Sequence, residues 1–208
     1  IVIAKKMEML GKKRSVIREI FEYGNKRRAE IGAENVFDFS LGNPSIPAPE
    51  KVKEVMTKLL TEKDAVALHG YTSAQGAPDV RKSCADYVNS SFGTSYTADN
   101  FYMTVGAAAS LTISLSAISE DKGEVIVLAP FFPEYTVFIK QAGMTPLIVK
   151  CREEDFQIDF DALICAINEN TKAIIVNSPN NPSGVVLSEE TIKKLSDVMS
   201  EAEAKYGK

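Results

Sequence analysis

Several residue types that often carry enzyme chemistry are scarce in this chain of 208 residues. It has no tryptophan, one histidine (His69) and three cysteines. Cys84, Cys151 and Cys165 are widely spaced and form neither a Cys-x-x-Cys pair nor a zinc-binding spacing, so we expect reduced thiols in a cytoplasmic protein. A Ser-His-Asp triad or a multi-histidine metal site would depend on His69 alone, which argues against both and against a metal cofactor.

The chain also lacks long hydrophobic runs and an excess of positive charge. No run approaches the roughly 20 apolar residues that span a membrane, and the opening residues 1–6 are too short for a signal peptide. The net charge of −4 and pI of about 5.2 give no basic patch, so we expect neither a nucleic-acid nor a membrane partner. With 45% hydrophobic and 25% charged residues, the composition is that of a globular protein.

Strand-like and helix-like segments alternate from residue 101 onward. The predicted strands are residues 101–104, 124–129, 145–150 and 172–177. The predicted helices are residues 111–118, 135–143, 159–167 and 188–204. This alternation predicts an α/β fold with three layers, α/β/α, in which helices cover both faces of a mostly parallel sheet.

The first hundred residues predict mainly helices. Apolar spacing indicates helices over residues 14–31, 50–60 and 78–92, and alternation over residues 36–40 indicates a short strand. Residues 41–49 hold one glycine and three prolines, which is typical of a rigid extended loop. We expect this loop to cross between domains, so that residues 1–48 and 49–208 are separate segments.

Residues 177–184 form a polar loop that the rest of the chain is organised around. The loop follows the predicted strand 172–177, which we expect to be buried and central, and two prolines stiffen it around Asn181. Asn181-Pro182 is also a plausible cis bond. Ligands of open α/β sheets bind at the carboxyl ends of such strands. The alternative is an ordinary Asn/Pro/Gly turn.

A second candidate is the turn at residues 104–110, where a predicted strand passes through Gly106 into a helix of small residues. Free N–H groups at such a helix start can hold a phosphate. The turn matches neither a Walker A motif nor Gly-x-Gly-x-x-Gly. The alternative is a tight turn whose alanines pack on the sheet.

A third candidate is the aromatic pair Phe131 and Phe132, which follows the strand 124–129. One of these rings could offer a flat face to a ligand ring, and at most one can do so if the strand persists, because neighbouring side chains point to opposite faces. The alternative is core packing, the commoner fate of phenylalanine. Tyr71 and Asn43 lie on earlier loops and are either solvated, capping, or at the rim of a ligand site.

The combination of these motifs, in order, resembles the fold-type I pyridoxal-phosphate aminotransferases, the group that includes aspartate and aromatic aminotransferases. The resemblance covers nearly the whole chain. The matching positions are Ser40-Leu-Gly-Asn-Pro44, Gly70-Tyr71 with Gly76 and Arg81, Thr104-Val-Gly-Ala107, Ala129-Pro130 and Asn180-Asn-Pro-Ser-Gly184. It implies that residues 1–48 are an arm or small-domain segment with a crossing loop, and that residues 49–208 begin the large cofactor-binding domain.

The resemblance also implies roles for individual residues. The backbone of Gly106, Ala107 and Ala108 would bind the phosphate of pyridoxal 5'-phosphate. Phe132 would stack on the pyridine ring, and Asn181 would hydrogen-bond its phenolic oxygen. Tyr71 would reach the partner's phosphate across a homodimer interface. Gly42 and Asn43 would face the substrate carboxylate.

Three residues that this chemistry needs are missing from the chain. The family's Schiff-base lysine, the aspartate that pairs with the pyridine nitrogen and the arginine that clamps the substrate carboxylate all lie at positions beyond Lys208. We therefore expect this chain to be the N-terminal portion of a longer enzyme and to be inactive in isolation. The expected function of that enzyme is amino-group transfer between an L-amino acid and a 2-oxo acid. A C–S lyase or synthase of the same fold, or a non-catalytic binding module, is the alternative.

Overall fold

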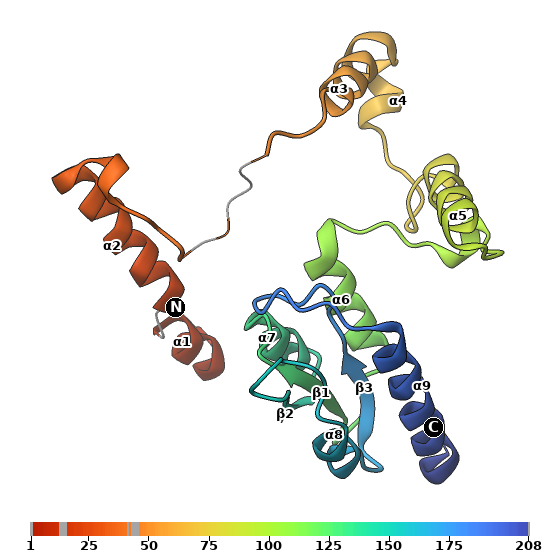
Figure 1. The fold of residues 1–208 in the computed structure, drawn as a ribbon. Coiled ribbons are helices and arrows are strands. Elements are labelled where there is room, and N and C mark those ends of the chain that lie inside the picture. Colours follow the sequence, from red (N-terminus) through yellow and green to blue (C-terminus); the bar gives the residue numbers. More distant parts are fainter. Residues whose placement is uncertain (1, 13–15, 41, 43–45, 208) are drawn as a thin grey trace. The chain divides into compact units, whose positions relative to one another are not determined.

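The structure is a computed structural model that describes residues 2–12, 16–40, 42 and 46–207 (Figure 1). Its contacts divide the chain into two compact units, Ile1–Tyr71 and Thr72–Lys208. The predicted division of the chain into residues 1–48 and 49–208 is not tested by these units and remains a prediction. None of the helices in the described ranges is long and apolar enough to cross a membrane.

The first unit consists of helices and connecting segments. The elements are α1 (Lys5–Lys12), α2 (Val16–Ile31), the 3-10 helix η1 (Ala33–Asn35), α3 (Glu50–Glu62) and α4 (Ala65–His69). The helices predicted over residues 14–31 and 50–60 are confirmed in the described residues as α2 and α3, and α2 ends where Gly32 adopts a positive φ of 91°. The strand predicted over residues 36–40 was wrong, because this segment pairs with no described strand.

The second unit carries the sheet and the helices that pack on it. Its elements are α5 (Pro78–Phe92), η2 (Ala98–Asn100), α6 (Gly106–Ala117), β1 (Glu124–Ala129), α7 (Glu134–Gln141), β2 (Thr145–Lys150), α8 (Phe160–Ala166), β3 (Thr171–Ile175) and α9 (Glu189–Tyr206). The bounds of β1 and β2 are those predicted from the sequence. The strand predicted over residues 101–104 was wrong, since this extended segment joins no sheet in the described part of the chain.

The sheet is parallel, with the strand order β2-β1-β3. β1 pairs with β2 from Glu124↔Thr145 to Ala129↔Lys150, and its other edge pairs with β3. β1 is therefore the central strand. The expectation that the strand before Asn177 is central and buried was wrong for the described chain, because β3 lies at the sheet edge and its residues are only half-buried.

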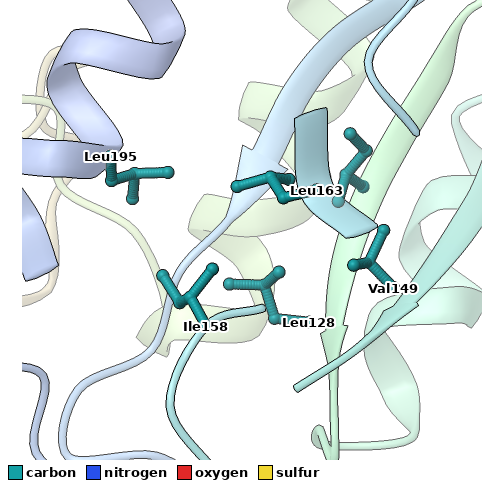
Figure 2. Close-up of a cluster of buried hydrophobic side chains, with 6 residues drawn as sticks. Leu128, Val149, Ile158, Leu163 and Leu195 are labelled. Atoms are coloured by element: carbon teal, nitrogen blue, oxygen red, sulfur yellow. The ribbon is translucent and has the colours of Figure 1, made fainter. Parts of the chain in front are cut away.

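The core consists of two clusters, one on each face of the sheet. Ile126 and Leu128 of β1 point to the face covered by α8 and α9, where they pack with Val149, Ile158, Leu163 and Leu195 (Figure 2). Val125 and Val127 point to the opposite face and pack with Leu115 of α6, Ile139 of α7 and Met144. This alternation is the two-residue period of a strand buried on both faces. It confirms the predicted three-layer α/β/α fold.

Candidate functional site

Side-chain hydrogen bonds fix the loop that follows β3. The Asn181 N–H donates to Asn177 Oδ1 at 2.8 Å. Asn180 Oδ1 accepts from the Ser183 N–H at 3.2 Å and from Ser183 Oγ at 2.9 Å. The Gly184 N–H donates to the carbonyl of Asn180 at 2.7 Å. Two of the three asparagines therefore use their side chains to hold the backbone, as is typical of Asx turns.

Asn181 differs from its two neighbours in having a free side chain. It is exposed, and its side-chain amide makes no hydrogen bond within the described residues. The Asn181-Pro182 peptide bond is cis, as the sequence suggested. A fixed backbone with an unengaged amide is suited to binding a polar group of a ligand.

The two phenylalanines after β1 have separate environments. Phe131 packs against the core cluster that contains Val125 and Val127. Phe132 is half-buried, and its ring meets Tyr135 edge-to-face with centroids 5.7 Å apart and an angle of 79° between the planes. Both rings are half-buried, and Phe131 is the one that packs against this core cluster.

The segments after β1 and β3 meet around a small cavity. It is lined by Phe131, Tyr135, Asn177, Asn180 and Ser183, among others, and has a volume of about 20 Å³. A cavity of this size holds about one water, so it is a packing gap and not a ligand pocket. It nevertheless brings two of the predicted loop segments together at the carboxyl edge of the sheet.

The first turn of α6 is open to solvent. Gly106 has a φ of 79°, a Cβ built there would have no atom within 4 Å, and residues 106–108 are exposed. Thr104 Oγ1 bonds to the carbonyl of Gly106 at 3.2 Å and to Ser110 Oγ at 2.5 Å, which ties this turn to the segment before it. The N–H groups at this helix start therefore point to open space. Residues 106–108 do not line the cavity described above.

The remaining predicted site residues lie in the first unit. Gly42 is exposed, with no atom within 4 Å of a Cβ built on it. Asn43 lies outside the described residues. Tyr71 is fully exposed. The roles expected for all three, and those of Gly106, Ala107, Ala108, Phe132 and Asn181, remain predictions.

The surroundings of Cys151 suppress the reactivity of its thiol. All three thiols are free. Burial raises the pKa of Cys151, and the nearby carboxylates of Asp159 and Asp155 raise it further. A thiol in such surroundings stays protonated at neutral pH and is a poor nucleophile.

Sequence reasoning gave no role to Arg81, a charged residue that is only 6% exposed. It matched only as one position of the family pattern. Arginine is rarely buried, so neither its type nor its place in a helix signals this environment. Its hydrogen-bond partners are Gly76, which precedes α5 in the sequence, and Ala98, which follows it.

Comparisons with known proteins agree with this geometry. A family model described as "Aminotransferase class I and II" matches residues 34–204. Aspartate aminotransferase of Pyrococcus horikoshii is 32% identical over 187 residues, which are 89% of this chain and 45% of that protein. Kynurenine–oxoglutarate transaminase 3 of Bos taurus is 30% identical over 175 residues, 79% of this chain and 38% of that protein.

A solved aminotransferase from Eubacterium rectale is 54% identical and superposes with a TM-score of 0.97, covering 100% of this chain and 52% of that one. The chain thus spans about half the length of the proteins it matches. Because the family match takes in most of its residues and the fold agrees, the chain belongs to the class I and II aminotransferase family.

Proposed function

We propose that the protein of native length is a pyridoxal-phosphate-dependent aminotransferase that moves an amino group between an L-amino acid and a 2-oxo acid. Family membership supports the reaction class. The observation that carries the proposal is the loop after β3, where Asn177 and Asn180 fix the backbone and leave the Asn181 amide free. This arrangement serves a bound ligand better than it serves a simple turn.

The first turn of α6 has the properties that a phosphate needs. Its leading N–H groups have no acceptor within the helix, and the helix dipole places partial positive charge there. The open space at Gly106 lets a phosphate approach the backbone of residues 106–108 closely. Ala107 and Ala108 offer no side-chain donor, so backbone N–H groups would supply the hydrogen bonds from this turn.

Phe132 and Asn181 would hold the ring of the cofactor. The Phe132 ring touches Tyr135 edge-to-face, which fixes its plane while leaving it half-exposed. The Asn181 side-chain N–H would donate to the phenolic oxygen of the ring and favour its ionised form. When bound, the cofactor supplies the electron sink for chemistry at the α-carbon of the substrate.

Contacts with substrate and partner are the finer part of the proposal. Gly42 and Asn43 would face the substrate carboxylate, and Tyr71 would reach the phosphate in the other subunit of a homodimer in the cytoplasm. The exposure of Tyr71, whose side chain is uncovered among the described residues of its unit, supports a role outside that unit. The relatives named above are an aspartate and a kynurenine transaminase, so both amino acids are donors to test.

The test is an absorption titration of the native-length protein with pyridoxal 5'-phosphate, followed by aspartate or kynurenine and a 2-oxo acid. We expect a bound-cofactor band that amino acid shifts and oxo acid restores. Asn181→Ala should raise the pH at which the band changes, because a donor to the ionised oxygen is lost. Asn25→Ala is the matched control, since the Asn25 side chain accepts a hydrogen bond from Arg28 of its own helix and is exposed.

Each alternative has its own result in this titration. Release of pyruvate and ammonia would indicate a lyase, and cofactor binding without turnover of any amino acid would indicate a binding module. A protein that binds no pyridoxal 5'-phosphate at all would disprove the proposal.

A further inference from the structure

Arg81 holds two carbonyl groups from opposite sides of α5. Its Nε–H donates to the carbonyl of Gly76 at 3.3 Å, and Nη1 donates to the carbonyl of Ala98 at 2.8 Å. The exposed carboxylate of Asp99 lies 3.5 Å from Nη1 and balances the charge. A buried guanidinium is costly unless it is paired and hydrogen-bonded, and its planar fork is suited to two separate acceptors. The two carbonyls are therefore fixed relative to each other.

The Gly76 carbonyl belongs to a tight turn that packs on the segment before α6. Two hydrogen bonds close this turn. The Gly76 N–H donates to the Ser73 carbonyl at 2.9 Å, and the Ser73 Oγ donates to the Gly76 carbonyl at 2.5 Å. The Met103 N–H donates to the carbonyl of Gln75 at 2.9 Å. Gly76 has a φ of 97°, and a Cβ built on it would lie 2.4 Å from Met103 Cγ. The turn at residues 73–76 and Met103 are thus in contact with no room for a side chain between them.

The contact at Met103 continues directly into the first turn of α6. The next residue, Thr104, bonds through Oγ1 to the Gly106 carbonyl and to Ser110. A series of hydrogen bonds and two peptide bonds, Gln75–Gly76 and Met103–Thr104, therefore joins the Arg81 guanidinium to the helix start. We propose that Arg81 is a positioning residue that, through the 73–76 turn and Met103, holds the first turn of α6 in place for the phosphate of the cofactor. The inference rests on the proposed function.

The test compares the affinities of the native-length protein for pyridoxal 5'-phosphate and for pyridoxal, which lacks the phosphate. Arg81→Met should weaken the binding of pyridoxal 5'-phosphate roughly tenfold, as it would if the binding-competent position of the turn were populated only about one tenth of the time. It should leave pyridoxal unchanged, so the preference for the phosphorylated form falls. Arg81→Lys should keep part of this preference, because an ammonium reaches one of the two carbonyls but not both. Lys82→Met is the control, since Lys82 is exposed and pairs with Asp86 of the same helix.

A second variant reaches the same contact from the other side. Gly76→Ala leaves the Arg81 side chain in place but would push the turn away from Met103, and it should lower the same preference. If Arg81→Met does not fold, Gly76→Ala and Arg81→Lys decide the matter. Equal weakening of both ligands, or of neither, would overturn the positioning role while leaving the proposed function standing. Failure of the unsubstituted protein to bind pyridoxal 5'-phosphate would overturn both.

Discussion

Both compact units contain helices, but the two units bury very different amounts of apolar surface. In the described part of the first unit, Gly24 is the one buried residue. All the buried hydrophobic residues, from Ala85 to Val198, belong to the second unit. The amphipathic face of α3 shows the contrast most clearly, because Val52, Val55 and Met56 remain 45–59% exposed. Apolar spacing is enough to form a helix, but it does not supply a surface for the helix to cover.

The first unit has a polar contact between α2 and residues 38–40. The Arg28 guanidinium of α2 reaches the Asp38 carboxylate at 3.1 Å, and the Ser40 Oγ donates to the same carboxylate at 2.6 Å. In the second unit the strand β1 has an apolar cluster on each face. The comparison therefore predicts that the second unit of this chain is stable by itself and that the first unit has a small free energy of unfolding.

The largest expected difference is in amide hydrogen exchange. Amides of β1 should exchange only through global unfolding, at a cost of about 5 kcal/mol or more. Amides of α3 should exchange through local opening at a small fraction of that cost, because no core residue covers the helix. Hydrogen–deuterium exchange of the 208-residue chain, read by mass spectrometry on peptides from residues 50–62 and 124–129, measures both. Equal protection of the two peptides would remove the distinction.

The next effect comes from truncating the same residue type in each unit. Leu163 in α8 is fully buried in the cluster of Figure 2, whereas Leu60 in α3 is 66% exposed. Leu163→Ala should lower the free energy of unfolding by about 3 kcal/mol, from lost transfer energy and a cavity. Leu60→Ala should change it by less than about 0.5 kcal/mol. Urea unfolding followed by circular dichroism measures both, and a large cost at Leu60 would show that α3 is covered after all.

The sequence predicts most strongly those elements that local chemistry decides. β1 and β2 were predicted with their bounds, because both are short runs of β-branched and apolar residues between turn formers. Pro78 and Gly93 marked the two ends of α5. The predicted strands at residues 36–40 and 101–104 failed for a common reason. A strand exists only where a partner accepts its hydrogen bonds, and the period of one segment carries no information about the partner.

The candidate site also has some features that the sequence predicted and others that only the structure showed. The meeting of the segments after β1 and β3 followed from the rule that carboxyl ends of parallel strands share one edge. The use of Asn177 and Asn180 to fix the loop, with Asn181 left free, needed coordinates, because all three asparagines look alike in sequence. The burial of Arg81 also needed them, since its acceptor Ala98 lies 17 residues away.

A smaller effect is expected at two helix caps that use the same residue type. The Asp159 carboxylate accepts from the Ala162 N–H at the start of α8, and the Asp64 carboxylate accepts from the Ala67 N–H at the start of α4, both at 3.0 Å. Asp159→Ala should lower the unfolding free energy of the second unit by about 1 kcal/mol. Asp64→Ala should leave it unchanged, because α4 belongs to the unit without a core. The urea midpoints of the two variants measure this difference. Asp159→Asn, which keeps a capping oxygen, should lose less unfolding free energy than Asp159→Ala.

The smallest effect concerns the polar contact of the first unit. Hydrogen bonds from the Ser40 hydroxyl and N–H, and then the Arg28 charge, hold the pKa of Asp38 below its ordinary value, although burial opposes them. A carboxyl whose pKa is lower in the folded state stabilises that state above the unfolded pKa. This contribution is lost as the pH falls through the folded pKa, below about 4.

Ser40→Ala should therefore raise the pKa of Asp38, so that the contact with Arg28 begins to fail at a higher pH during acidification. An NMR titration of the Asp38 carboxyl carbon measures the shift. Thr61→Ala is the control, because the Thr61 hydroxyl donates to the backbone carbonyls of Thr57 and Lys58 within α3. If Ser40→Ala left the Asp38 pKa unchanged, the carboxylate would not be held by this contact. The first unit would then lack the polar counterpart to the apolar core of the second.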